Sequence, residues 1–160
     1  MQETSLPLDR LAGFAKEYLR DFKILIHVPQ LPQQVATRKW SPPPSATLKT
    51  NFDGAMFGQL DEVGIGIVIR NSEGKVMAAF TEKIQKPSSV EILELLAVRH
   101  AFLFSAETRF SSSIFEGDSE SVVKSLQGWG LENSQGGHII KDILSYANFF
   151  QSFSFSHVVR

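Results

Sequence analysis

Two consecutive runs of apolar and β-branched residues, joined by a short turn, restrict the fold of this chain more than any other feature. The stretch VGIGIVIRNSEGKVMAAFTEKI, residues 63–84, predicts a β-hairpin with its turn between Asn71 and Gly74. Glycines at positions 64 and 66 indicate either the close approach of another backbone or a twisted strand. The hairpin therefore predicts antiparallel strands in the folded body.

The segments around the hairpin alternate between strand and helix patterns. The stretch LKTNFDG predicts a strand that ends in a turn, and apolar residues at helical spacing predict a helix from Ser88 or Ser89, as N-cap, to about Glu107. The remaining segments read in order as a strand, a helix capped by Ser119, a loop, a helix and an alternating strand: SSIFEGD, SESVVKSLQGW, LENSQGG, HIIKDILSYANFF and SFSFSHVV. The order β-β-β-α-β-α-α-β predicts an α/β fold with a mixed sheet and helices packed on it.

The N-terminal part of the chain differs in character from this body. Residues 1–35 contain apolar residues at intervals of three and four, typical of an amphipathic helix, which either packs on the domain or is the remnant of an upstream region. Residues 36–47 include three consecutive prolines and predict an extended linker. Trp40 either anchors this linker on the domain or belongs to a plain spacer. The folded domain is expected over residues 48–160.

Composition excludes several classes of protein. The 160 residues include no cysteine, which excludes disulfides, thiolate chemistry and cysteine-based zinc sites. No apolar run approaches the roughly 20 residues that span a bilayer, so no membrane partner is expected. The N-terminus lacks a secretory signal pattern, so an intracellular location, nuclear or cytoplasmic, is expected. The net charge of −1 lacks the basic surplus that is usual in nucleic-acid binders. Any phosphate-binding surface would therefore have to be local, or phosphate groups would have to bind through metal ions.

Three acidic residues stand out by their positions. Asp53 lies at or just past the end of the first strand, Asp118 lies at a strand-to-helix junction, and Glu94 lies near the apolar stripe of the long helix. Carboxylates held close together need a counter-charge, which Mg²⁺ or Mn²⁺ supplies through oxygen ligands. Two such ions about 4 Å apart can hold the attacking and leaving oxygens of a phosphodiester.

Each of these carboxylates also has a structural explanation. An Asp followed by Gly is more often a plain turn, an Asp-Ser before a helix is more often a cap, and a helix glutamate is usually solvated. Taken singly, the structural explanation is the more common one. The metal site is favoured only by the family resemblance that the order and spacing of all three carry, described next.

Six motifs occur in the order found in a known family: WSPPPSATLKTNFDGA, GIGIVIRNSEG, ELLAVRHA, FEGDSESVV, HIIKDIL and FSFSHVVR. In this order they resemble the plant retroelement-type RNase H module, which belongs to the RNase H type 1 superfamily and is associated with reverse transcriptases. The resemblance covers residues 40–160. It implies a ribonuclease-H-like fold: a mixed five-stranded sheet, three antiparallel strands and then parallel strands, flanked by helices.

The resemblance also implies a reaction and a set of site residues. The family hydrolyses the RNA strand of RNA–DNA hybrids with divalent metal, so an endonuclease with two Mg²⁺ or Mn²⁺ ions and a nucleic-acid partner is expected. By position, Asp53 matches the first-strand aspartate that bridges both ions, Glu94 the helix glutamate, and Asp118 the aspartate ending the fourth strand. These three are the expected catalytic and metal-binding residues, and water is the nucleophile.

The sequence departs from the family pattern at several points. The family continues into a last helix with a fourth acidic residue, whereas this sequence ends at Arg160, so the expected fold lacks that helix and carboxylate. Asp61 and Asp142 fall in a hairpin loop and on a different helix, and are not expected to replace it. Glu120 stands where many relatives have a substrate-contacting glutamine, and a carboxylate there would repel phosphate. His157 is expected to be structural.

Three functions remain open from the sequence. The first is a metal-dependent ribonuclease acting on RNA–DNA hybrids through Asp53, Glu94 and Asp118. The second is a catalytically inactive module derived from a retroelement that binds nucleic acid or a protein; the acidic net charge favours it. The third is an inert fragment of a larger retroelement polyprotein.

Overall fold

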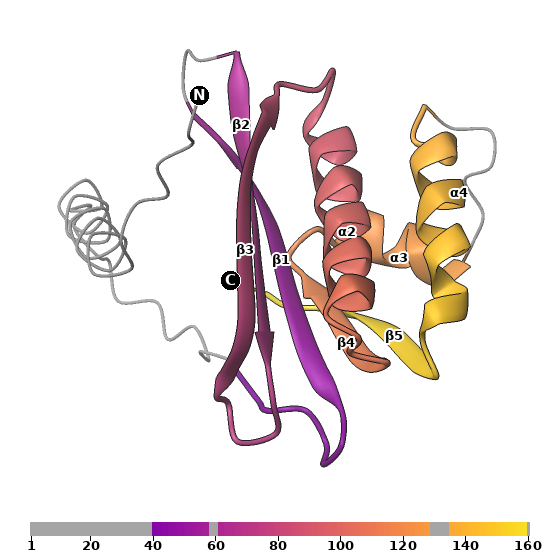
Figure 1. Cartoon of the computed structure of the whole chain (residues 1–160). Helices are drawn as coiled ribbons and strands as arrows, with labels where there is room; N and C mark the ends of the chain where they lie inside the picture. The colour runs from indigo at the N-terminus through magenta and orange to yellow at the C-terminus, as the bar shows by residue number, and fades with distance from the viewer. Residues whose placement is uncertain (1–39, 58–60, 129–134, 160) are drawn as a thin grey trace, which may run out of the picture. The chain divides into compact units, whose positions relative to one another are not determined.

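The body of the chain is a five-stranded sheet with helices on one side, seen in a computed structural model that describes residues 40–57, 61–128 and 135–159 (Figure 1). The strands lie in the order β3-β2-β1-β4-β5. Their bounds are β1 Leu48–Met56, β2 Glu62–Arg70, β3 Val76–Gln85, β4 Ser112–Gly117 and β5 Ser152–His157. Strands β1, β2 and β3 pair antiparallel, whereas β4 pairs parallel with both β1 and β5. The mixed α/β sheet predicted from the sequence is confirmed.

The β2–β3 hairpin has the turn that the sequence predicts. The side-chain oxygen of Asn71 accepts hydrogen bonds from the backbone N–H groups of Glu73 and Lys75, at 3.0 and 2.9 Å. Gly74 has a φ of 78°, a conformation that favours glycine because it has no Cβ. Among the described residues, a Cβ at Gly64 would meet the Phe57 ring at 3.0 Å, and one at Gly66 would meet nothing within 4 Å. Of the two explanations offered for these glycines, the close approach of another backbone is not found in the described part of the chain.

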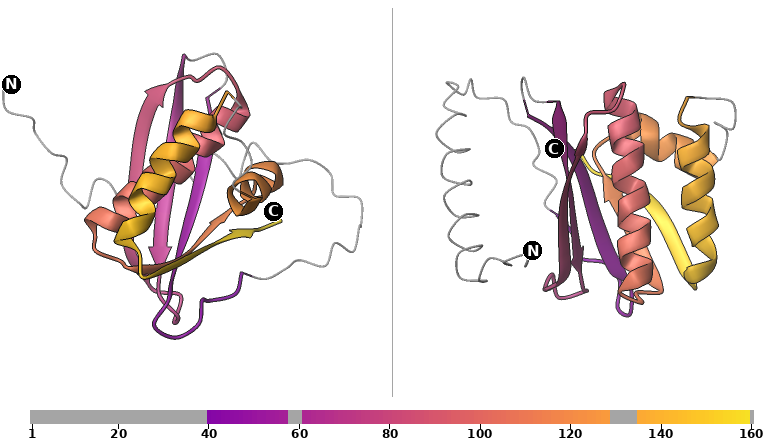
Figure 2. Two further views of the ribbon diagram at one scale, coloured as in Figure 1. Left: turned by 90° about the vertical axis from the view of Figure 1, so that its right-hand side faces the viewer. Right: turned by 45° about the horizontal axis from the view of Figure 1, so that its top comes forward.

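Three α-helices lie on the same side of the sheet, as the two views of Figure 2 also show. They are α2 Val90–Glu107, α3 Glu120–Gly128 and α4 Gly137–Tyr146, the last followed by a 3₁₀ turn, η1 Ala147–Phe149. Ser89 is the N-cap of α2, because its hydroxyl accepts a hydrogen bond from the N–H of Ile92 at 3.2 Å. The helix predicted over residues 138–150 is therefore α-helical to Tyr146 and continues as the tighter 3₁₀ turn.

The core lies between the sheet and helix α2. Phe102 of α2 stacks on Phe115 of β4 with ring centroids 4.0 Å apart, and both rings are fully buried. Isoleucines 65, 67 and 69 of β2 project into the same layer. In the described residues no helix covers the opposite face of the sheet, which is referred to below as the open face.

One sequence-based expectation about β1 is wrong. The strand does not turn at Asp53-Gly54 but continues to Met56, so Asp53 lies within the strand. Gly54 pairs with Ile65 in the same ladder, which is incompatible with a turn there. The Asp-Gly pair is held extended by its pairing with β2, which overrides its local preference for a turn.

Residues before β1 contact the domain through Trp40. The Lys49 ammonium lies 5.4 Å from the centre of the Trp40 ring, and the Arg70 guanidinium lies 5.7 Å from it. Trp40 therefore anchors the end of the proline-rich linker on the sheet. The amphipathic segment predicted within residues 1–35 lies outside the described residues. None of the described helices has the length and apolar character needed to cross a membrane.

Candidate metal centre

The three carboxylates singled out from the sequence lie together. Asp53 comes from β1, Glu94 from the second turn of α2, and Asp118 from the residue directly after β4. One carboxylate oxygen from each lies within 4.8 Å of the other two. Glu94 is buried, with 6% of its surface exposed, and the other two are half-buried. Residues distant in sequence thus form one acidic cluster at the edge of the helix layer.

Helix α2 packs close to Asp53 because Gly54, the next residue of β1, has no side chain. A Cβ at Gly54 would meet Leu93 Cγ at 2.5 Å, closer than such atoms can approach. The glycine therefore lets α2 pack directly on β1 at Leu93. Glu94, the next residue of the helix, is brought beside Asp53 by this contact.

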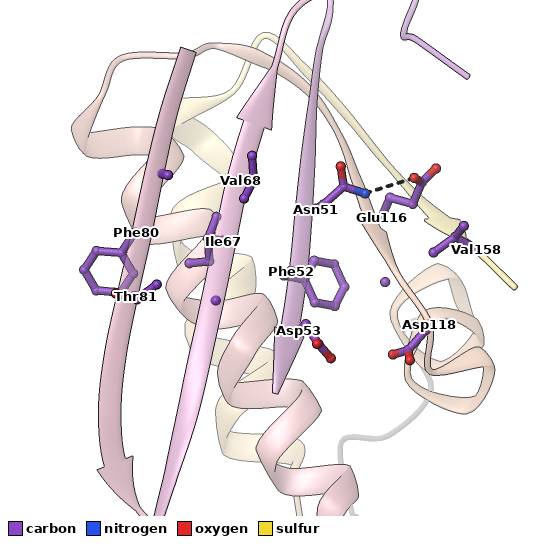
Figure 3. A pocket seen from close by; sticks show the side chains of 13 residues that line it. Asn51, Phe52, Asp53, Ile67, Val68, Phe80, Thr81, Glu116, Asp118 and Val158 are labelled. Atoms are coloured by element: carbon purple, nitrogen blue, oxygen red, sulfur yellow. Dashed lines mark hydrogen bonds between the residues drawn. The ribbon is translucent and has the colours of Figure 1, made fainter. Parts of the chain in front are cut away.

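Gly117, which precedes Asp118, also allows close packing next to the cluster. A Cβ at Gly117 would meet Phe52 Cζ at 2.5 Å, so the Phe52 ring fills the space that a side chain there would need. Strand β4 pairs parallel with β1 up to Asn51 and Glu116, and its last residue closes over Phe52. Asp118 follows at once and faces Asp53 from the other side, as Figure 3 shows.

The donor set matches a hard divalent cation. All three candidate ligands are carboxylates, and oxygen donors of this kind suit Mg²⁺, Mn²⁺ and Ca²⁺ better than softer metals. Three negative charges within 4.8 Å repel one another, and a divalent ion would offset that repulsion. Exposed acidic groups often cluster without an ion, but burial of Glu94 makes this cluster costly to maintain without a counter-charge. The residues present therefore fit a divalent metal.

A groove of about 360 Å³ adjoins the cluster on the sheet surface (Figure 3). Asp53 and Asp118 lie at one end of it, and Asn51 and Glu116 lie at the other. Its remaining lining is mostly apolar or small: Phe52, Gly66, Ile67, Val68, Ala79, Phe80, Thr81, Gly117 and Val158. The acidic cluster is thus accessible from a cavity large enough for a small chemical group.

Two further residues surround Asp118. A ring nitrogen of His157, Nε2, lies 3.1 Å from the backbone oxygen of Asp118, so this histidine ties the end of β5 to the β4–α3 junction. Glu120, at the start of α3, forms an ion pair with Lys124 at 2.7 Å. The hydrogen bond from Lys124, reinforced by the charge of Lys124 and by a smaller attraction from His157, holds the pKa of Glu120 below its ordinary value. Glu120 therefore stays ionised near the cluster.

The two acidic residues set aside from the sequence do not join the cluster. Asp142 forms an ion pair with Arg99 at 3.3 Å between α4 and α2. Asp61 is exposed just before β2, where its backbone oxygen accepts a hydrogen bond from Lys86. Among the described residues, the acidic group that could hold a metal ion consists of Asp53, Glu94 and Asp118.

Sequence reasoning missed a polar network on the open face next to this site. It links Lys49 and Asn51 of β1, Arg70 of β2 and Glu116 of β4. A signal was present: Lys49, Asn51 and Asp53 alternate along one strand, as do Glu116 and Asp118 at the end of another, so each set shares a face.

Comparisons with known proteins agree with this architecture. The family model described as Reverse transcriptase-like matches residues 51–160. The structure is similar to RNase H1 from the halophilic archaeon Halobacterium salinarum NRC-1, with 24% identity, a TM-score of 0.64, and coverage of 71% of this chain and 86% of that one. No curated protein sequence matches the chain significantly.

Two other solved structures show the same fold. The N-terminal RNase H domain of a Mycobacterium tuberculosis protein is 18% identical with a TM-score of 0.63, covering 72% of this chain and 84% of that one. LC11-RNase H1, isolated from compost and solved with an RNA/DNA hybrid, is 19% identical with a TM-score of 0.55, covering 71% and 86%. Identities this low establish the fold alone. With the family match covering more than half of its length, the chain belongs to the reverse transcriptase-like family and has an RNase H-like domain.

Proposed function

We propose that this domain hydrolyses the RNA strand of RNA–DNA hybrids with the help of Mg²⁺ or Mn²⁺. The observation that carries the proposal is the carboxylate cluster of Asp53, Glu94 and Asp118, whose oxygens approach within 4.8 Å. Its ligands come from β1, α2 and the end of β4 of an RNase H-like fold. A solved relative, LC11-RNase H1, is bound to such a hybrid, which supports this substrate class.

The position of each of the three carboxylates indicates its role in the proposed reaction. Asp53 and Asp118 face each other at the mouth of the groove, where they would hold ions within reach of a phosphodiester. Glu94, which is buried in α2, would complete the ligand set from the helix side of the sheet. The packing of the helix would fix its orientation. Divalent ions held by these three carboxylates would activate a water molecule as the nucleophile and would offset negative charge on the phosphate. Selection of RNA over DNA requires contacts with the 2′-hydroxyl, and the groove beside the cluster is where such contacts would form.

A retroelement of the plant type is the source that we infer for this domain. The support is the sequence order of six motifs, from the proline-rich entry through the Asp53 strand to the final FSFSHVVR strand. The match to the Reverse transcriptase-like family over residues 51–160 is consistent with this origin.

The test is a cleavage assay on a hybrid whose RNA strand is labelled, with Mg²⁺ or Mn²⁺ and the full 160-residue chain. We expect cutting of the RNA strand alone, absent in EDTA, and a fall of at least about a hundredfold in Asp53→Asn. Asp142→Asn is the matched control, since Asp142 is an exposed carboxylate outside the cluster. Full activity of a folded Asp53→Asn variant would contradict the proposed mechanism.

A catalytically inactive module that binds nucleic acid or a protein is the second candidate. It is favoured by the net charge of −1 and by the ionised Glu120 beside the cluster, because both oppose the approach of a phosphodiester to the carboxylates. Hybrid binding measured by fluorescence anisotropy, in EDTA and in Mg²⁺, separates the two candidates. Binding by a folded chain that yields no product in the cleavage assay would favour the second.

A further inference from the structure

A buried ion pair lies on the open face of the sheet, next to the acidic cluster. The Lys49 ammonium and the Glu116 carboxylate are 3.0 Å apart, and each side chain is only 7% exposed. Four other ion pairs of the described residues each have at least one partner that is more than 30% exposed. A pair so protected from water interacts through a lower effective dielectric than an exposed pair does.

Both members of the pair are held by further contacts. Lys49 donates a hydrogen bond to the backbone oxygen of Ser41 at 2.7 Å. Asn51 donates to the second oxygen of Glu116 at 3.0 Å and accepts from Arg70 at 3.1 Å. Both carboxylate oxygens of Glu116 are therefore engaged, and Figure 3 shows the carboxylate and its bond from Asn51 directed away from Asp118.

Glu116 lies close to a candidate metal ligand along its strand, and its network partner Asn51 does so along β1. Asn51 and Asp53 share one face of β1, and Glu116 precedes Asp118 by two residues at the end of β4. Two residues along a strand correspond to about 7 Å. Glu116 is thus a fourth carboxylate at the rim of a cluster that already carries three, and Lys49 is the cation that neutralises it.

We propose that the Lys49–Glu116 pair is a positioning and charge-balancing element that sets the affinity of the cluster for divalent metal. The inference rests on the proposed binding of metal by Asp53, Glu94 and Asp118. With both partners present, the pair adds no net charge beside the ions. Removing the positive partner leaves a negative charge that attracts the ions, and removing the negative partner leaves a positive charge that repels them.

The two single substitutions therefore have opposite effects on metal affinity. A unit charge on the order of 10 Å from a divalent ion, near a solvent-exposed groove, is expected to change the dissociation constant by about threefold at low salt. A purely structural role predicts something different: loss of either partner would loosen the junction of β1 and β4 and weaken binding in both cases.

The experiment is Mn²⁺ binding to the full chain, measured by electron paramagnetic resonance at low and high salt. We expect Lys49→Met to bind Mn²⁺ about threefold or more tighter than wild type, Glu116→Gln to bind it weaker by a similar factor, and the double variant to lie within about twofold of wild type. The effects shrink as salt rises. Lys83→Met is the matched control, because Lys83 pairs with Glu62 on the same sheet with 72% and 56% exposure, and it is expected to leave affinity unchanged.

Shifts in the same direction for both single variants, or no shift in either, would overturn the inference while leaving the metal site intact. Wild-type protein that binds no more Mn²⁺ than Asp53→Asn would instead remove the metal site itself, and the inference with it. Circular dichroism checks that each variant folds. If the single variants do not fold, Arg70→Met decides: it removes a half-buried cation from the same network, and unchanged Mn²⁺ affinity in it would contradict the charge-balancing role.

Discussion

Asp53 and Gly66 lie directly opposite each other in the β1–β2 ladder. Residues paired in this way project from the same face of a sheet, so a side chain at position 66 would stand beside the Asp53 carboxylate. A Cβ there would meet no atom within 4 Å, and both residues line the groove. The missing side chain at Gly66 therefore keeps space open next to the acidic cluster.

Replacing Gly66 with valine is expected to separate stability from activity. The fold has room for the new side chain, and glycine within a strand is less stable than a larger residue by about 0.5–1 kcal/mol, so the melting temperature should stay the same or rise. The valine would obstruct the groove beside Asp53, so hybrid cleavage should fall about tenfold or more. Thermal unfolding and single-turnover cleavage rates measure the two effects.

Gly64→Val is the matched control for this substitution. A Cβ at Gly64 would meet the Phe57 ring at 3.0 Å, so this variant is expected to lose stability. Cleavage by Gly66→Val at the wild-type rate would show that substrate does not use the groove.

Divalent metal is expected to stabilise the fold through the acidic cluster. A ligand at 100 times its dissociation constant stabilises the native state by about 2.7 kcal/mol when it does not bind the unfolded chain. Wild-type protein should gain about this much at saturating Mn²⁺, and Asp118→Asn should lose most of the gain because one of three ligands is neutralised. Urea unfolding with and without Mn²⁺ measures both, with Asp142→Asn as a control that keeps the full gain.

The carboxylate of Glu120 should titrate below its ordinary pKa, and Lys124 should be the main cause. A group whose pKa is lowered in the native state contributes stability above its unfolded pKa and loses it as the pH falls through the native pKa. Lys124→Met is expected to return the pKa of Glu120 toward its ordinary value and to remove this acid-sensitive contribution. Carbon NMR of the side-chain carboxyl group follows the change, and an unaltered titration would rule out Lys124 as the cause.

Gly117→Ala is expected to destabilise the domain by about 1–3 kcal/mol. The added methyl group would meet the Phe52 ring, which is itself nearly fully buried and has little freedom to move. Denaturant unfolding measures the loss, and Phe52→Leu combined with Gly117→Ala should recover part of it by making room. Gly128→Ala is the control, since a Cβ there meets nothing within 4 Å. Equal stability of Gly117→Ala and wild type would mean that β4 can move away from β1 to make room for the methyl group without lowering the free energy of unfolding.

Local signals explain which parts of the fold were predictable. The β2–β3 hairpin is set by apolar runs and by a turn in which Asn71 and Gly74 satisfy the backbone on their own. The cap by Ser89 is equally local, because its partner is three residues away. Features of this kind need no knowledge of distant contacts, and the sequence predicts them correctly.

Distant contacts explain what was mispredicted or missed. Asp53-Gly54 has the local preference of a turn, but the pair is extended because β2 pairs with it and Leu93 needs the space above Gly54. The Lys49–Glu116 pair depends on the parallel register of β1 and β4, which joins residues more than sixty positions apart. The proximity of the three carboxylates was inferred from a family resemblance for the same reason.

Strand β1 has an antiparallel neighbour on one side and a parallel neighbour on the other, and this arrangement ties the cluster to the integrity of both halves of the sheet. Detachment of β4 would carry Asp118 away, and displacement of α2 would carry Glu94 away. An ion shared by these ligands would thus act as a removable cross-link that closes two long loops of the chain. Its release would remove a constraint from both β4 and α2, and amide hydrogen exchange would then speed up in each of them.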